Sequence, residues 1–333
     1  MKVAILGGGS CFAMNLAHHL VFQCHEVLSI SRSPMRSKPF TYGLEDYIDG
    51  TFKSTPQPFR YEQAHLVTQL PRIMVLLDTF RPDLIINFAA LCEVGLSWNH
   101  ALDYYETNLM SLVRLTNELS IRSWFKKFVQ IGSSEVYGSV SEAAKEDNPI
   151  RPSSPYATSK AAFDFHLQAI AKNQSFPAVI CMPSNGYCEG QTLNRIIPKT
   201  IISALTGQKF KLQGGGQAQK SYLHADDISR GILLVASNGQ LGETYNVGPV
   251  NPLSIRLIVS LLANMFQKSL EDVCEVAPER VGQDSCYWLN SDKIKTLGWK
   301  QEVGLATGFS RMVDWVRRYP ELLTMDQTYT HKP

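Results

Sequence analysis

The segment KVAILGGGSCFA, residues 2–13, sets the expected architecture of this chain. An apolar run over Lys2–Leu6 leads directly into the turn Gly7–Gly9, and an apolar helical pattern over Cys11–Phe22 follows. A tight turn between a strand and a helix lets backbone N–H groups and the helix N-terminus approach a pyrophosphate. The segment therefore predicts the first strand, turn and helix of a dinucleotide-binding sheet.

The same alternation of short apolar runs and amphipathic stretches continues to about residue 180, which is typical of βαβ units. It predicts an α/β fold, a Rossmann-type doubly wound parallel sheet with a smaller, irregular α/β lobe. The predicted strands are Lys2–Leu6, Glu26–Ile30, Leu84–Phe88, Lys127–Gly132 and Ala178–Cys181, and the predicted helices are Cys11–Phe22, Ala101–Ser120 and Tyr156–Asn173.

Beyond residue 180 proline and glycine break the chain into short elements, for example at Pro183, Pro198 and Gly214–Gly216. We therefore predict a cofactor-binding domain over residues 1–180 and a mainly substrate-binding lobe over residues 181–333. A strand pattern at Tyr245–Val247 indicates that the chain returns to the first domain near residues 223–250.

The composition of the chain indicates which classes of protein can be excluded. The chain has 333 residues, of which 44% are hydrophobic and 19% charged, with a formal net charge of +2. This is a globular composition, and its charge is too small for a broad nucleic-acid-binding face. The apolar runs are too short to cross a bilayer, and no signal-peptide pattern is present. The 7 scattered cysteines form no C-x-x-C pair. We therefore expect a soluble cytoplasmic protein with reduced thiols and no metal, membrane or nucleic-acid partner.

The residues after the second predicted strand indicate which cofactor is bound. An NAD enzyme usually carries an acidic residue here for the ribose 2′-hydroxyl. This chain has Ser31, Arg32 and Arg36 instead, and no carboxylate follows until Glu45. Hydroxyl and guanidinium donors suit a 2′-phosphate. The sequence therefore favours NADP, with NAD as the alternative.

A second group of residues predicts a site for proton transfer. Tyr156 and Lys160 are spaced i, i+4 on a predicted helix, so both side chains lie on one face. The lysine ammonium is expected to lower the pKa of the tyrosine, which could then exchange a proton near neutrality. Ser133 ends the preceding strand and could hydrogen-bond the hydroxyl that Tyr156 deprotonates.

Several segments together resemble the nucleotide-sugar 4,6-dehydratases and epimerases of the extended short-chain dehydrogenase/reductase superfamily. The resemblance runs in order along nearly the whole chain. Besides Tyr156–Lys160, it rests on Asn87–Ala90, Glu106–Asn108, Gly132–Gly138, Ser184–Tyr187, Arg195–Pro198, Lys220–Asp227, Gly242–Gly248, Arg280–Asp284 and Leu297–Trp299.

The resemblance implies a role for each matching residue. The catalytic set would be Ser133, Ser134, Glu135, Tyr156 and Lys160. A tightly bound, recycled cofactor would contact Gly7, Gly9, Ser10, Cys11, Phe12, Ser31, Arg32, Arg36, His65, Leu66, Ala89, Ala90, Asn108, Tyr156 and Lys160. A nucleotide-diphosphate sugar would contact Glu93, Ser133, Asn185, Asn194, Arg195, Lys220 and Arg280. The resemblance also implies a homodimer formed through a four-helix bundle of Ala101–Ser120 and Tyr156–Asn173.

Departures from the family pattern leave the reaction open. Ser10 and Ala13 replace two glycines of the turn, Glu93 replaces a histidine, and Lys220 replaces a phosphate-binding arginine. Ser134 stands where glucose-type dehydratases carry an aspartic acid, whereas mannose-type dehydratases have serine there and tend to use NADP. The leading hypothesis is a 4,6-dehydratase. An epimerase, a uronate decarboxylase and a catalytically inactive NADP sensor are the alternatives.

Overall fold

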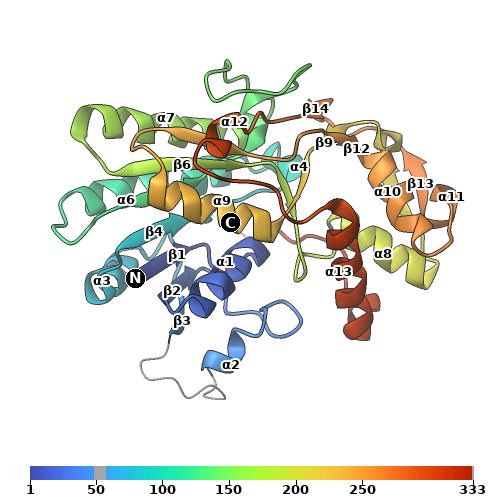
Figure 1. Cartoon of the computed structure of the whole chain (residues 1–333), viewed down its shortest axis with the longest axis horizontal. Coiled ribbons are helices and arrows are strands. Elements are labelled where there is room, and N and C mark those ends of the chain that lie inside the picture. The colour runs from blue at the N-terminus through green and yellow to red at the C-terminus, as the bar shows by residue number, and fades with distance from the viewer. Residues whose placement is uncertain (49–57, 332–333) are drawn as a thin grey trace.

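The protein is described here by a computed structural model, which covers residues 1–48 and 58–331 (Figure 1). A sheet of 7 strands lies at its centre, in the order β3-β2-β1-β4-β5-β6-β11, and every pairing is parallel. The strands are β1 (Lys2–Leu6), β2 (Glu26–Ser31), β3 (Phe59–Gln63), β4 (Leu84–Asn87), β5 (Phe128–Ile131), β6 (Ala178–Pro183) and β11 (Thr244–Val247). The strand order reverses between β1 and β4, where α/β sheets bind ligands beyond the carboxyl ends of their strands.

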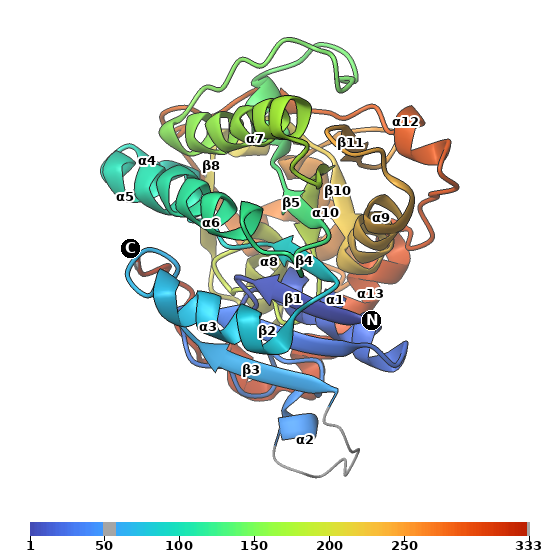
Figure 2. The same cartoon turned by 90° about the vertical axis from the view of Figure 1, so that its left-hand side faces the viewer.

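Alternate side chains of β1 face opposite layers of helices. Val3 and Ile5 belong to the buried cluster that includes α1 (Cys11–Phe22) and α9 (Ala225–Asn238). Ala4 and Leu6 belong to the cluster on the other face. That face is covered by α3 (Leu70–Phe80), α6 (Ser111–Ser120) and α7 (Pro155–Gln174), as Figure 2 shows. Because both faces are covered, the strand can be apolar throughout, which explains the unbroken apolar run in the sequence.

The α/β class and the Rossmann-type sheet are confirmed. Strand β1 and helix α1 have the predicted limits. The predicted helix over residues 101–120 consists of α5 (Ala101–Tyr105), a π-helical turn η1 (Glu106–Met110) and α6. Strand β3 was not predicted, because at this edge of the sheet only Phe59 is fully buried and no apolar alternation results. Helix α3 was also missed, as was the short helix α2 (Glu45–Ile48).

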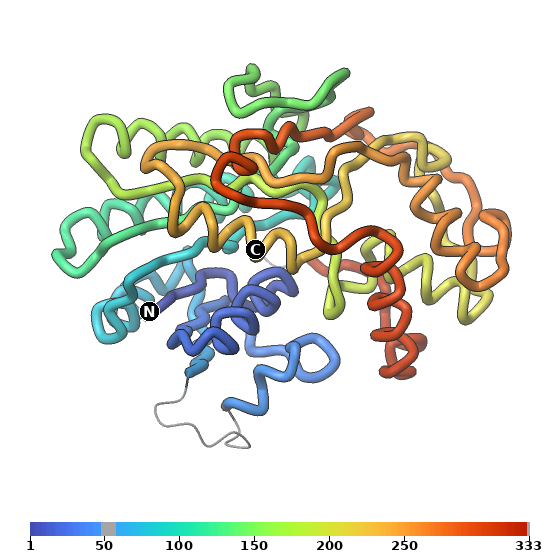
Figure 3. The backbone as a smooth tube through the Cα atoms, viewed as in Figure 1, coloured from blue at the N-terminus to red at the C-terminus, as the bar shows by residue number. Residues whose placement is uncertain are grey.

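After β6 the chain builds the second lobe and then returns to the sheet as β11, beside β6 (Figure 3). The lobe packs α8 (Ile196–Thr206), α10 (Ile255–Asn264) and α13 (Leu305–Arg318) around their own apolar cluster. Its strands are β7 (Asn185–Tyr187), β8 (Phe210–Gln213), β9 (Gln219–Lys220), β10 (Tyr222–His224), β12 (Leu253–Ser254), β13 (Cys274–Ala277) and β14 (Cys286–Tyr287). The remaining short elements are α4 (Val94–Ser97), η2 (Ser134–Tyr137), η3 (Gly214–Gly216), α11 (Leu270–Val273), α12 (Asp292–Lys295) and η4 (Pro320–Leu323).

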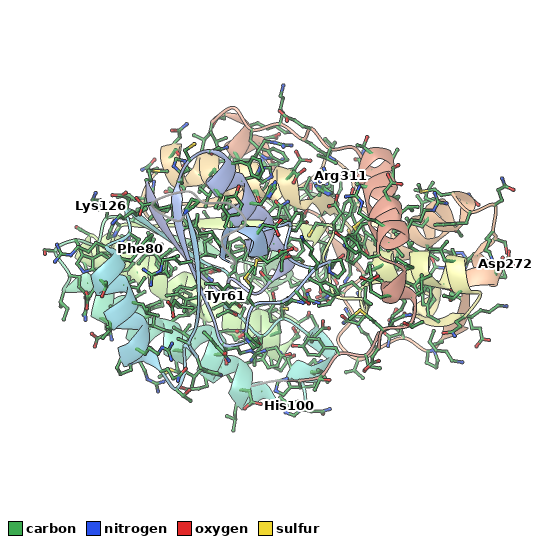
Figure 4. All side chains as sticks on the ribbon, turned by 90° about the horizontal axis from the view of Figure 1, so that it is seen from below. Tyr61, Phe80, His100, Lys126, Asp272 and Arg311 are labelled. Carbon is green, nitrogen blue, oxygen red and sulfur yellow. The ribbon has the colours of Figure 1, made fainter. Side chains whose placement is uncertain are left out.

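Polar contacts join this lobe to the sheet layer. Arg311 on α13 points inward in Figure 4 and donates to Glu189 at 2.8 Å and to Asp226, in the first turn of α9, at 2.7 Å. Among residues 1–48 and 58–331, no helix combines the length and the apolar character needed to cross a bilayer.

Candidate active site

The glycine turn after β1 has the shape that a dinucleotide requires. Gly7 has φ of 74°, and a Cβ atom there would lie 2.4 Å from the backbone nitrogen of Ala89, so only glycine fits. Ser10 caps α1 by accepting a hydrogen bond from the Ala13 amide at 3.2 Å. The first-turn amides of this 12-residue helix carry its positive dipole end. The backbone therefore fits a diphosphate, even though serine and alanine replace two family glycines.

The residues after β2 lie beside this turn. Ser31 is buried, and its hydroxyl lies so close to Gly9 that a Cβ atom there would be 2.9 Å away. The Arg32 carbonyl accepts a hydrogen bond from the Gln63 side chain at 2.9 Å. The Arg36 guanidinium lies 3.6 Å above the Phe40 ring and donates to a backbone carbonyl of the second lobe at 3.3 Å.

A cavity of about 510 Å³ opens between the carboxyl ends of the strands and the second lobe. Many residues predicted to act together, although far apart in sequence, line it: Ser10, Phe12, Ala90, Glu93, Ser133, Ser134, Glu135, Tyr156, Lys160, Asn185, Asn194, Arg195, Lys220 and Arg280. The other predicted residues do not line this cavity: Gly7, Gly9, Cys11, Ser31, Arg32, Arg36, His65, Leu66, Ala89 and Asn108.

Asn108 illustrates why some of these residues lie outside the cavity. Its amide donates to the Leu91 carbonyl and to the Ser159 hydroxyl, both at 3.0 Å, and it accepts from the Leu91 amide at 2.8 Å. These bonds tie the segment after β4 to α7. Asn108 therefore positions the cavity wall in this structure.

Ser133, Tyr156 and Lys160 meet at the carboxyl end of β5. Lys160 Nζ donates to the Ile131 carbonyl at 2.7 Å. Burial raises the pKa of Tyr156 above its ordinary value, and a hydrogen bond with Ser133 lowers it by less. The cavity removes the phenolate from water, and the Lys160 ammonium is directed to a backbone carbonyl. The lowering of the Tyr156 pKa by Lys160 therefore stays a prediction.

Glu135 lies on η2, next to Ser133. Its side chain is buried, and burial raises the pKa of its carboxyl group. The half-buried Lys220 faces it, and burial lowers the pKa of this lysine to about 8. A carboxyl group and an amine whose pKa values are both displaced toward neutrality are typical of a site that exchanges protons.

Glu93 and Arg195 form an ion pair inside the cavity, with 2.7 Å between Oε1 and Nη2. Asn194 donates to the same carboxylate oxygen at 3.2 Å. Glu93, which replaces a family histidine, therefore holds residues expected to grip the nucleotide. The pair also neutralises one of the cations in the cavity.

Two tyrosines near the site were not predicted from the sequence. Tyr104 on α5 packs edge-on against Tyr156, with ring centroids 6.3 Å apart, and donates to the Glu93 carbonyl at 2.6 Å. Tyr287 on β14 reaches the Glu135 carboxylate at 3.3 Å. Tyr104 is far in sequence from Glu93 and Tyr156, and Tyr287 is far from Glu135, so local spacing carries no signal for these contacts.

The described residues also include a group of metal-ligand type outside the cavity. Ligand atoms of His100, Asp103 and His331 lie within 4.8 Å of one another. The two imidazole rings are stacked, with centroids 4.0 Å apart and planes inclined by 21°. One nitrogen of each ring lies near the same oxygen, Asp103 Oδ2, at 3.6 Å for His100 Nδ1 and 2.9 Å for His331 Nε2. We interpret the group as a carboxylate flanked by two histidines.

Comparisons with known proteins agree with this geometry. The sheet order, the glycine turn and the Ser/Tyr/Lys cavity define a dinucleotide-dependent α/β enzyme. Residues 3–248 match the model of the NAD dependent epimerase/dehydratase family, and the chain belongs to that family.

Some individual relatives match more of the chain than the family model does. A probable dTDP-glucose 4,6-dehydratase of Sinorhizobium fredii is 29% identical over 336 residues, which is 95% of this chain and 92% of that protein. The crystal structure of DesIV, a dTDP-glucose 4,6-dehydratase from Streptomyces venezuelae with NAD bound, is similar with a TM-score of 0.86 and 25% identity, over 96% of this chain and 98% of that one.

A longer relative matches only in part. The trifunctional UDP-glucose 4,6-dehydratase/UDP-4-keto-6-deoxy-D-glucose 3,5-epimerase/UDP-4-keto-L-rhamnose-reductase of Arabidopsis thaliana is 26% identical over 250 residues. These residues are 74% of this chain but 38% of that protein, so the chain spans well under half of its length.

Proposed function

We propose that this protein is a nucleotide-sugar 4,6-dehydratase, which converts a nucleotide-diphosphate hexose to its 4-keto-6-deoxy form. The observation that carries the proposal is the buried Glu135 in the same cavity as Tyr156 and Lys160. Oxidation at carbon 4 by a nicotinamide cofactor would need, of these three residues, only the tyrosine and the lysine. Loss of water from carbons 5 and 6 needs a further base, which Glu135 supplies. The relatives named as 4,6-dehydratases support the same reaction.

The proposal assigns a role to each residue of the site. Tyr156 takes the proton of the 4-hydroxyl, which Ser133 orients, and Lys160 holds the nicotinamide ribose. The nicotinamide, when bound, supplies reversible hydride transfer, first from carbon 4 and later to carbon 6. Glu135 removes the proton of carbon 5, which the ketone at carbon 4 has made acidic. Asn185, Asn194, Arg195, Lys220 and Arg280 hold the nucleotide diphosphate, since cations and amides suit phosphate oxygens.

The decarboxylase alternative is less well supported. It needs a cation to bind the carboxylate of its substrate. Arg195 is paired with Glu93, and the two cations that act on Glu135, Lys220 and Arg280, are the ones proposed to hold the diphosphate. A uronate would therefore compete with the diphosphate for these cations.

Two variants test the proposal against an epimerase. Glu135→Gln should still reduce the cofactor on addition of the correct sugar nucleotide, and then stall with the near-ultraviolet absorbance of reduced nicotinamide. Its rate of product formation should fall at least about 10²-fold, as expected for a lost general base. Tyr156→Phe should block the first oxidation. An epimerase would tolerate Glu135→Gln, so full turnover by this variant would refute the dehydratase assignment.

We propose further that the cofactor is NADP. The support is the sequence after β2, where Ser31, Arg32 and Arg36 stand and a carboxylate is missing until Glu45. Calorimetric titration should show tighter binding of NADP than of NAD. Arg32→Ala should selectively weaken NADP by on the order of 1.5–3 kcal/mol, the value of a charge-assisted hydrogen bond. Arg60→Ala, an exposed arginine on β3 paired with Glu62, is the matched control. Equal affinity of the unmodified protein for both cofactors would contradict the proposal.

A further inference from the structure

A row of buried polar side chains leads away from Glu135. The Tyr287 hydroxyl lies 3.3 Å from Glu135 Oε2 and 2.8 Å from Asp284 Oδ2. Tyr287 is 2% exposed and Asp284 is 7% exposed, and neither lines the cavity. The two residues therefore contact the catalytic carboxyl group from outside the cavity lining.

This arrangement holds one tyrosine proton between two carboxyl groups. A tyrosine hydroxyl donates one hydrogen bond and can also accept. The shorter contact makes Asp284 the acceptor of the Tyr287 proton, so the Tyr287 oxygen is free to accept from a protonated Glu135. Burial raises the pKa values of both Glu135 and Tyr287, so each group releases its proton less readily than it would in water. The three groups therefore form a connected path along which a proton can move in either direction.

The path continues to the protein surface. Asp284 Oδ1 accepts a hydrogen bond from the Ser139 hydroxyl at 2.8 Å, and Ser153 donates to Oδ2. Ser139 is exposed, and its oxygen also accepts from the Ser285 amide at 2.9 Å, which fixes its position. Hydroxyl groups of this kind can accept and donate, so they can pass a proton from water to Asp284.

We propose that Tyr287 and Asp284 are a proton relay that returns a solvent proton to Glu135 during turnover. The inference rests on the dehydratase function proposed above. Glu135 takes the proton of carbon 5 and gives it to the departing 6-hydroxyl group, which leaves as water. Glu135 is then ionised, while carbon 5 still lacks a hydrogen.

The relay completes the proton balance of the reaction. Tyr287 gives its hydroxyl proton to Glu135 and takes one from Asp284, which takes one from solvent at Ser139. Glu135 then delivers its new proton to carbon 5. Tyr156 releases the proton that it took from the 4-hydroxyl, so one proton enters and one leaves. The sum is the loss of one water, with no oxidant or reductant beyond those of the main reaction.

The test uses the holoenzyme in light and heavy water, with dTDP-glucose and GDP-mannose as candidate substrates. Tyr287→Phe and Asp284→Asn should each lower kcat about tenfold or more, within the range of general acid–base catalysis, and change KM less than about threefold. Both variants should show an altered solvent isotope effect, which a merely structural role would not cause. Tyr245→Phe, which removes the hydroxyl of another buried tyrosine outside the cavity, is the matched control and should turn over normally.

A second measurement needs no substrate. The infrared carboxyl band of Glu135, identified by subtraction of the Glu135→Gln spectrum, should titrate at a different pH in Tyr287→Phe, because this variant removes the hydroxyl group that lies 3.3 Å from the Glu135 carboxyl group. An unchanged titration overturns the relay, and so does an unchanged kcat in Tyr287→Phe. The two measurements can also disagree. If the infrared band shifts in Tyr287→Phe, the contact between Tyr287 and Glu135 is upheld. If the unmodified enzyme at the same time dehydrates neither sugar, the proposed dehydratase function fails for both substrates.

Discussion

Lys220 shows how one residue can give the site a pH dependence. The side chain lies in the cavity near Glu135, and its ammonium nitrogen is 5.2 Å from the centre of the Tyr287 ring. Burial lowers the pKa of Lys220 to about 8, because the charged amine loses its hydration. The charge of this residue is therefore present below pH 8 and is lost as the pH rises through that value.

We expect the affinity for a nucleotide diphosphate to fall as the pH rises above about 8, since Lys220 would then be neutral. Loss of one charge-assisted hydrogen bond corresponds to about 1.5–3 kcal/mol, or about tenfold to a hundredfold in Kd. Calorimetric titration with dTDP or GDP between pH 6.5 and 9.5 measures the effect. Lys220→Arg should remain charged and keep its affinity at high pH. A pH-independent Kd in the unmodified protein would show that Lys220 does not bind the phosphates.

At the scale of elements, the start of α7 places the catalytic tyrosine. Ser154 is the N-cap, and its hydroxyl accepts a hydrogen bond from the Ala157 amide at 3.2 Å. Pro155 occupies the first helical turn, where its missing N–H costs nothing. Tyr156 is thus fixed within the first turn, so an error in the helix start would displace the reacting hydroxyl.

We expect Ser154→Ala to destabilise the protein by about 0.5–2 kcal/mol, as for other lost N-caps, and also to lower kcat. Urea denaturation and steady-state kinetics measure the two effects. Ser254→Ala removes an equivalent cap from α10, where Ser254 accepts from the Leu257 amide. This control should lose similar stability but retain kcat. Equal kcat in the two variants would mean that the α7 cap has no role in placing Tyr156.

The elements also differ in how far they could be predicted. Strand β1 and helix α1 were predicted to the residue because an unbroken apolar run and an N-cap serine mark their limits. The π-helical turn η1 could not be predicted from periodicity. It contains Asn108, whose side chain is fully occupied by contacts to Leu91 and Ser159, and those contacts exist only in the folded chain.

At the scale of the whole molecule, several large apolar side chains remain exposed on α5, η1 and α7. Leu102 is 82% exposed, Met110 42% and Phe165 54%. These elements are the ones expected to pair in a four-helix bundle, and apolar side chains gathered on such a surface are typical of a subunit interface. We infer a homodimer in which this face is covered by the same face of a second copy.

Analytical ultracentrifugation should therefore show a dimer at micromolar concentration. Leu102→Glu combined with Phe165→Glu should give a monomer, because both copies would place charges in an apolar interface. Phe22→Glu is the control, since Phe22 is 67% exposed at the end of α1 and lies outside the inferred interface. A monomeric mass for the unmodified chain would rule out this arrangement.

The sequence by itself determined the sheet class, the dinucleotide turn, the Tyr156–Lys160 pair and the family resemblance. These features depend on residues close together in the chain, where spacing and periodicity record the local geometry. Only the tertiary structure decided the pairing of Glu93 with Arg195, the raised pKa of Tyr156 and the contact of Tyr287 with Glu135, residues 152 positions apart. Such contacts arise when the second lobe folds against the sheet and excludes water. Burial then shifts the pKa values of the side chains, and the distances in the fold decide which side chains are in contact. Neither burial nor distance can be read from a local sequence pattern.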